Sequence, residues 1–193
     1  AHQWYAEFLA GMGRTNEAIE QIHLAQELDP LSLIIQSIEA AILNYARQYD
    51  RGIEQANRVI ERDPNFAEAY AYLGFGYEQK GMFREAMDAY QKYSALMGRN
   101  TPEASAIRTA PVSSPQDYWL KMVELAKPPT GSDFDYAMAW SRLGKKDKAI
   151  SMLEQASEKR SNNILYLRVN PNLDPLRSEP RFQQLLKRVN LAF

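Results

Sequence analysis

Cysteine is absent from this chain of 193 residues, and histidine occurs only twice, as His2 and His23. Without cysteine there can be no disulfide and no thiolate metal site. Catalysis by a serine–histidine–aspartate set, and metal binding by several correctly spaced imidazoles, are not supported by two isolated histidines. We therefore predict no catalytic residues, no metal site and no cofactor.

An excess of one charge is also missing. The chain has 23 basic and 24 acidic residues, for a formal net charge of -1, whereas proteins that bind nucleic acids carry a basic excess or stripe. No apolar run approaches the roughly 18 residues that a bilayer-spanning helix needs, and no secretory signal pattern is visible. We expect no direct nucleic-acid contact, no membrane insertion and a cytoplasmic location.

What the chain does have is a 34-residue period. Ala18, Gly52 and Ala86 follow one another at steps of 34 residues. Each is followed at offsets of four and seven residues by another small, apolar or aromatic residue, which places all three side chains on one helical face. These followers are Ile22 and Ala25, Ala56 and Val59, and Tyr90 and Tyr93. A period of this length predicts an array of stacked helix pairs.

Turn and capping residues predict where the helices begin and end. Gly at 11, 13 and 81 is suited to helix ends, and Thr101-Pro102 and Ser114-Pro115 each read as a cap followed by proline at the first helical position. The expected helices cover about 2–12, 16–28, 32–46, 50–62, 66–80, 83–96, 102–109 and 115–127. Three prolines interrupt residues 170–182, so the last helix is expected to start near Pro180.

The spacing divides the chain into four parts. Residues 1–98 hold three repeats, 99–131 a divergent helical pair or insert, 132–160 a fourth repeat, and 161–193 a C-terminal cap. Whether the second part is a repeat or a lid stays open, and residues 127–132 are expected to form a loop. Because the chain begins with Ala1 inside an amphipathic pattern, we interpret it as a piece of a longer protein.

The third copy resembles the tetratricopeptide repeat. Its residues follow the order of aromatic, Leu-Gly and Tyr on one helix, then small and aromatic positions on the next: Tyr70, Leu73, Gly74, Tyr77, Gly81, Phe83, Ala86 and Tyr90. The second copy is degenerate, with Gln36 and Glu39 at positions where the family prefers large apolar residues. This resemblance implies an all-α fold, a right-handed α-solenoid of tetratricopeptide-like helix pairs closed by a C-terminal capping helix.

A narrower resemblance covers most of the chain. Segments beginning at Trp4, Leu28, Tyr77 and Leu173 look like those of the C-terminal repeat regions of bacterial multidomain regulators. In such regulators the repeats follow a winged-helix, serine/threonine kinase or cyclase domain. The resemblance implies a regulatory or interaction region whose effector chemistry lies on another domain.

The resemblance also implies a concave groove lined by the first helix of each pair. Carrying the groove positions over residue by residue gives Gln3, Glu7, Ser37, Ala41, Asn44, Tyr45, Ala71, Phe75, Glu78, Gln79, Phe134, Met138, Ser141 and Arg142. Some relatives hold an acidic peptide terminus with a clamp of Lys, Asn and Arg, and this clamp is missing here. We therefore reject a chaperone-tail adaptor and expect Tyr45 and Phe75 to accept an apolar anchor.

Other motifs have ordinary explanations. Gly11-Met-Gly13 and Gly74-Phe-Gly76 do not follow a strand and lack the third glycine of a phosphate-binding loop. Carboxylate pairs such as Glu17 and Glu20 lie among basic residues, as on solvated helix faces. We predict a non-enzymatic module that binds a protein or peptide in its groove. The alternative is a small-molecule sensor that relays to an absent kinase or DNA-binding domain. Weak self-association through the N-terminal pair is a further expectation.

Overall fold

The computed structural model describes residues 1–127 and 132–191, and every regular element in these residues is a helix. The chain forms two compact units, residues 1–111 and 112–193, which are described separately. The predicted loop at 127–132 falls mostly outside the described residues. The elements of the first unit are α1 (His2–Gly11), α2 (Thr15–Leu28), α3 (Leu33–Tyr45), α4 (Tyr49–Arg62), α5 (Ala67–Gln79), α6 (Phe83–Leu96) and α7 (Pro102–Thr109). The elements of the second are α8 (Pro115–Leu125), α9 (Asp133–Arg142), α10 (Lys146–Glu158), the 3-10 helices η1 (Asn162–Tyr166) and η2 (Pro171–Leu176), and α11 (Pro180–Arg188).

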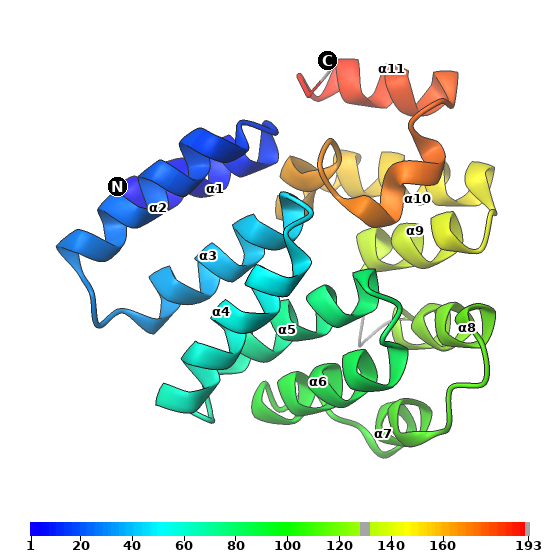
Figure 1. Ribbon diagram of the computed structural model, residues 1–193. Helices are drawn as coiled ribbons and strands as arrows, with labels where there is room; N and C mark the ends of the chain where they lie inside the picture. Colours follow the sequence, from blue (N-terminus) through cyan, green and yellow to red (C-terminus); the bar gives the residue numbers. More distant parts are fainter. Residues whose placement is uncertain (128–131, 192–193) are drawn as a thin grey trace. The chain divides into compact units, whose positions relative to one another are not determined.

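In the first unit each helix packs against the next in the chain (Figure 1). The pairs α1–α2, α3–α4 and α5–α6 repeat at the predicted spacing, and α7 adds to α6. Each pair also contacts the following pair, since α2 packs on α3 and α4 packs on α5. The all-α, tetratricopeptide-like solenoid fold is therefore confirmed.

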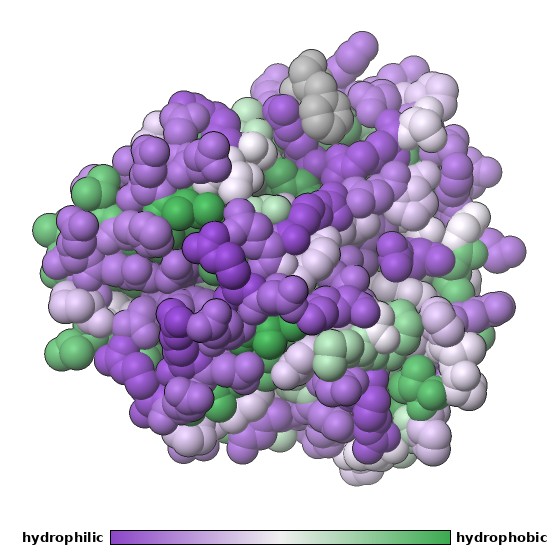
Figure 2. All heavy atoms as spheres, viewed as in Figure 1, coloured by the Kyte–Doolittle hydropathy of each residue, from purple (hydrophilic) through white to green (hydrophobic). Residues whose placement is uncertain are grey.

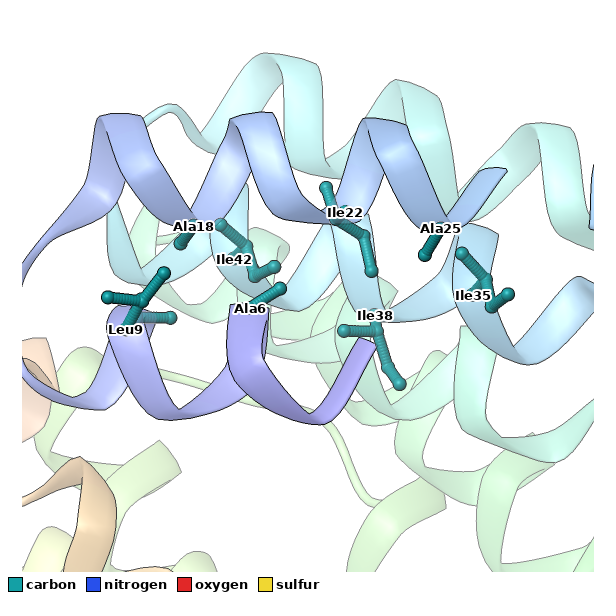
Figure 3. Close-up of a cluster of buried hydrophobic side chains, with 9 residues drawn as sticks. Ala6, Leu9, Ala18, Ile22, Ala25, Ile35, Ile38 and Ile42 are labelled. Carbon is teal, nitrogen blue, oxygen red and sulfur yellow. The ribbon is translucent and has the colours of Figure 1, made fainter. Parts of the chain in front are cut away.

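The core of the first unit is a seam shared by neighbouring pairs. Side chains from α1, α2 and α3 point toward one another in Figure 3, where Leu9 and Ile22 are fully buried and Ile42 almost so. A second cluster joins α3, α4, α5 and α6 through Ala40, Ala56, Leu73 and Ala89. No pair buries its apolar face alone, so the pairs stabilise one another by removing this surface from water.

Glycine at position 74 allows two helices to cross closely. A Cβ atom there would lie 2.9 Å from ring carbons of Tyr90, so the predicted clash is present. Ala40, at the equivalent position 34 residues earlier, is fully buried. The third pair thus accommodates a tyrosine on α6 by leaving out a side chain on α5.

The turn inside each pair needs a left-handed residue. Gly13 and Gly81 have φ of 74° and 73°, values that glycine adopts without steric cost. The second pair has Arg47 at this position, with φ of 64°. An L-residue pays roughly 1–2 kcal/mol for this conformation, which is a further sign that the second copy is degenerate.

Capping follows the predictions for α7 and α8. The hydroxyl of Thr101 accepts a hydrogen bond from the Ala104 amide, and that of Ser114 accepts one from the Asp117 amide. Both helices have proline at their first position. α7 packs on α6 in the first unit and α8 packs on α9 in the second, so the predicted segment 99–131 contributes one helix to each unit.

The second unit is built on the α9–α10 pair. α8 and η2 pack against α9, and η1, η2 and α11 contact α10. As the prolines predict, residues 171–176 form a separate short helix and the last helix starts at Pro180. α11 buries Phe182, Leu185 and Leu186, as expected for a capping helix with one apolar face. The fully buried Leu173 and Leu176 of η2 complete this packing.

Candidate functional site

The predicted groove residues lie on three helices that belong to two different units. Eight of the ten principal residues are on α3 and α5 of the first unit: Ser37, Ala41, Asn44, Tyr45, Ala71, Phe75, Glu78 and Gln79. The other two, Phe134 and Met138, are on α9 of the second unit. The site of the first unit is described first.

Tyr45 and Phe75 form an aromatic pair between two repeats. Their ring centroids are 5.4 Å apart with an interplanar angle of 54°, a tilted arrangement typical of favourable aromatic contacts. Both side chains are half-buried. The pair joins the end of α3 to the middle of α5, so it bridges the two first helices that the sequence predicted to line the groove.

Two further half-buried residues extend this surface along α5. Ala71 and Gln79 lie four residues before and after Phe75, and residues at this spacing share one face of a helix. The Gln79 amide donates a hydrogen bond of 3.0 Å to Oε1 of Glu78, which is itself buried. We name Tyr45, Ala71, Phe75 and Gln79 the aromatic surface. It combines two rings, a methyl group and an amide.

On α3 the remaining groove positions are closed to a partner. Ser37 is fully buried, and its hydroxyl donates a 2.9 Å hydrogen bond to the carbonyl of Ile34. Ala41 is also buried. These two residues lie on the same helical face as Tyr45, but only Tyr45 retains part of its surface. They contribute to packing rather than to the aromatic surface.

Asn44 differs most from the expectation of a groove residue. It is fully buried, and its side-chain amide donates a 2.9 Å hydrogen bond to the carbonyl of Tyr72 on α5. A Cβ atom on Gly52 of α4 would overlap with Oδ1 of Asn44, and one on Gly76 of α5 would come within 3.2 Å of it. Asn44 therefore connects α3, α4 and α5, in a space that two glycines leave open.

In the second unit, the structure covers both predicted residues. Phe134 is buried. The sulfur of Met138 accepts a 3.2 Å hydrogen bond from the Asn170 side chain, just before η2. Ser141, also predicted, is buried, while Arg142 is exposed and lies 5.3 Å from the ring centroid of Trp119. The C-terminal segment therefore occupies part of the predicted α9 surface.

Glu7 on α1 has a shifted titration. Burial raises the pKa of its carboxyl group above the usual value, and the hydrogen bond from Gln3 acts in the opposite direction. The Gln3 amide donates to Oε1 of Glu7 at 3.4 Å. A single carboxyl group beside an amide lacks the second titratable partner of an acid–base pair, so this feature marks partial desolvation on α1.

Metal and membrane chemistry find no support in the part of the chain that the structure describes. Residues 1–127 and 132–191 hold no group of three potential His, Cys, Asp or Glu ligands. Among the helices of these same residues, none has the length and apolar character to cross a membrane. His2 is hydrogen-bonded to Gln21 and His23 to Glu39, so both histidines contact neighbouring helices.

The sequence reasoning missed the apolar surface of the first pair. Leu28 and Leu31 are three-quarters exposed, although Arg62 and Asn65 occupy the equivalent positions of the next pair. Figure 2 shows hydrophobic side chains at the edge of the molecule, over the end of α2 and the start of α3. The signal was available in the sequence, since leucine replaces polar residues at one step of the period.

Comparison with known proteins gives two partial relatives. No family model matches the chain. The Small glutamine-rich tetratricopeptide repeat-containing protein 2 of Mycosarcoma maydis is 39% identical over 75 residues, which are 39% of this chain and 21% of that protein. The protein of the same name in Saccharomyces cerevisiae is 31% identical over 87 residues, or 45% and 25% of the two chains. The chain thus spans a quarter or less of the length of these relatives.

Among solved structures, one similar chain is described as "YrrB: a TPR protein with an unusual peptide-binding site". It is 18% identical, the match covers 88% of this chain and 91% of the other, and the TM-score is 0.39. A score this low supports no inference about the site. The two sequence relatives, the 34-residue spacing and the helix pairs agree, and on their joint evidence the chain is a tetratricopeptide-repeat protein.

Proposed function

We propose that this chain is a non-catalytic module that binds a protein or peptide partner through the aromatic surface of its first unit. The observation that carries the proposal is the Tyr45–Phe75 pair, which joins two repeats and leaves both rings half-buried. Aromatic side chains that expose part of a ring supply large contact area at low entropic cost and are frequent binding anchors. The partner would place an apolar side chain against the rings.

The polar neighbour of the rings suggests how the partner backbone is held. The Gln79 amide lies one helical turn beyond Phe75 and can donate to or accept from a peptide group. Neither aromatic ring nor amide selects a charge, so we propose a partner segment with an aromatic or aliphatic anchor and without a requirement for an acidic terminus. This agrees with the missing Lys, Asn and Arg clamp.

The four-part organisation remains a proposal in the same sense. We propose three repeats in residues 1–98, a divergent segment in 99–131, a fourth repeat in 132–160 and a cap in 161–193. The predicted placement within a bacterial multidomain regulator likewise stays a prediction, since both sequence relatives named above are fungal proteins.

A peptide selection tests the proposed function. The full chain is immobilised, a displayed library of random peptides is selected on it, and the enriched peptides are titrated by fluorescence anisotropy. We expect Phe75→Ala to weaken binding about tenfold or more, as truncation of an interface anchor commonly does. Phe75→Leu keeps the apolar bulk and should weaken it less. Leu120→Ala, an exposed apolar residue of the second unit, is the matched control and should bind as the wild type does.

Unchanged helicity and melting temperature must accompany the loss for the surface to be implicated. Equal affinity of the wild type and both Phe75 variants would contradict the proposal. If no peptide is enriched, the alternative of a small-molecule sensor moves ahead. Its ligand would be sought in the second unit, which has a hollow of about 360 Å³ lined by Pro115, Gln116, Trp119, Arg142, Leu143 and Pro175.

A further inference from the structure

Two large apolar side chains on α1 point into solvent. Trp4 is 72% exposed and Phe8 is 47% exposed. They are four residues apart and so lie on one face of the helix. Large exposed aromatic residues that share a face mark interaction sites more often than single exposed leucines do. We name these two residues the α1 stripe.

The period shows what this face does elsewhere in the array. Ile38 and Ile42 of α3 stand 34 residues after Trp4 and Phe8, and they are only 4% and 2% exposed. Both point into the cluster that contains side chains of α2 (Figure 3). The same face of α3 is therefore covered by the second helix of the preceding pair.

One period further along, the same relation holds. Tyr72 and Gly76 of α5 are the next equivalents, and Tyr72 packs against the cluster shared with α4. A Cβ atom on Gly76 would lie 2.7 Å from Cγ1 of Ile53 on α4. In both observed junctions this face contacts a second helix, and the described residues of the first unit place none against the α1 stripe.

We propose that the α1 stripe receives an amphipathic helix of a partner protein, which packs on α1 as α2 packs on α3. The proposal rests on continuity with the repeat junctions of the first unit rather than on exposure alone. The partner helix would present small and aliphatic residues at positions i, i+3 and i+7, the pattern of Ile53, Ala56 and Ile60 on α4. This surface is separate from the aromatic surface on α3 and α5, so the two proposals can fail independently.

Side-chain size makes the partner more specific. In the α4–α5 junction the large Ile53 faces Gly76, so a large residue on one helix meets a missing side chain on the other. Phe8 occupies the position of Gly76 in the first pair. The partner helix is therefore expected to carry alanine or glycine where α4 has isoleucine, because close packing penalises two large side chains at one crossing.

A stand-in helix tests the proposal. The probe is a fluorescein-labelled peptide with the sequence of residues 49–63 and the change Ile53→Ala, held helical by a lactam between outward-facing side chains, because free peptides of this length are only marginally helical. Its binding to the full chain is measured by anisotropy. The variants are Trp4→Ala/Phe8→Ala and, as a control of similar exposure to Phe8, Leu120→Ala, at 46%.

We expect the wild type and Leu120→Ala to bind the probe equally, and the double variant to bind it about tenfold more weakly or worse. A peptide that keeps Ile53 should bind less tightly than the probe. The proposal is overturned if the double variant binds as the wild type does, if a probe with Ile60→Asp binds equally well, or if the wild type binds no probe at millimolar concentration.

Sedimentation of the same proteins distinguishes a second copy from a partner. The partner proposal expects a monomeric wild type whose sedimentation is unaffected by Trp4→Ala/Phe8→Ala. If the wild type dimerises and the double variant does not, the α1 stripe binds a second copy of this chain and the assignment to a partner helix is wrong. Unchanged circular dichroism confirms that the double variant is folded, since both residues are outside the core cluster.

Discussion

The second helix pair solves the same packing problem as the first and third pairs with different residues. Ala10 and Ala18 face the seam in the first pair, whereas Asn44 and Gly52 hold the equivalent positions in the second. The pairs also differ at the turn, where Gly13 and Gly81 flank a left-handed Arg47 in the period. The comparison teaches that a repeat tolerates an unusual residue when a position on a neighbouring helix changes with it.

The strongest way to break this comparison is Gly52→Ala. The new Cβ atom would overlap with Oδ1 of Asn44, whose amide is already fixed by its bond to the Tyr72 carbonyl. We expect the free energy of unfolding to fall by about 1–3 kcal/mol, the usual cost of overpacking, despite the better helix propensity of alanine. Urea denaturation of both proteins measures the difference.

A double-mutant cycle provides the control. Asn44→Ala recreates the Ala10 and Ala18 combination of the first pair when it is joined to Gly52→Ala. We expect the double variant to be more stable than the sum of the single effects predicts, because contacting residues are not additive. Additive single effects would show that the two positions are independent and would contradict the comparison.

The turn of the third pair gives the next largest effect. Gly81 has φ of 73° and a Cβ atom there would meet no other atom within 4 Å. Gly81→Ala therefore isolates the cost of a left-handed L-residue, which we expect to lower the free energy of unfolding by about 1–2 kcal/mol. A neutral effect in thermal and urea unfolding would mean that the turn adjusts without strain.

The converse substitution sharpens the comparison. Arg47→Gly gives the second pair the residue that the first and third pairs have, and Arg47 is exposed. We expect a stabilisation of up to about 1 kcal/mol, reduced by the greater freedom of glycine in the unfolded chain. Arg47→Ala is the matched control, since it removes the guanidinium and retains the strained backbone, and it should not stabilise the protein.

The smallest expected effect concerns how helices begin. α3 and α5 start without a side-chain cap, whereas α9 starts with a capping box between Ser132 and Asp135. Burial raises the pKa of Asp135 above its ordinary value of 3.8, and hydrogen bonds from Ser132 oppose the shift. A raised folded pKa means that the protonated form favours folding. Its contribution is complete below the unfolded pKa and is lost as pH rises through the folded value.

Asp135→Asn should remove this dependence. We expect the difference in melting temperature between the variant and the wild type to change as pH rises from below 3.8, and to become constant above the folded pKa. The variant keeps an oxygen that can accept from the Ser132 amide, so the cap itself is preserved. A difference independent of pH across that range would show that Asp135 titrates normally.

The sequence predicted the helix pairs well because the period is carried by many residues at once. The position of Gly74 at a helix crossing, the caps at Thr101 and Ser114, and the start of the last helix at Pro180 depend on local chemistry, and the structure confirms them. The end of α8 at Leu125, two residues earlier than expected, depends on where the helix meets its surroundings.

The candidate site was harder to predict, for a physical reason. Assigning residues to a groove from helix position alone identifies a face but not its depth. Asn44 is buried because Gly52 and Gly76, on two other helices, leave room for it. Met138 is contacted by Asn170 from the C-terminal segment, 32 residues away. Such contacts come from the tertiary arrangement and are invisible to a periodic pattern.

The most direct test of the proposed function is hydrogen–deuterium exchange of the full chain with and without a selected peptide. The account predicts slower exchange in the second half of α3 and along α5, around Tyr45 and Phe75, with little change in α10. The protection should disappear in Phe75→Ala at the same peptide concentration. Protection confined to other helices, or equal protection in the variant, would contradict the claim that the aromatic surface binds the partner.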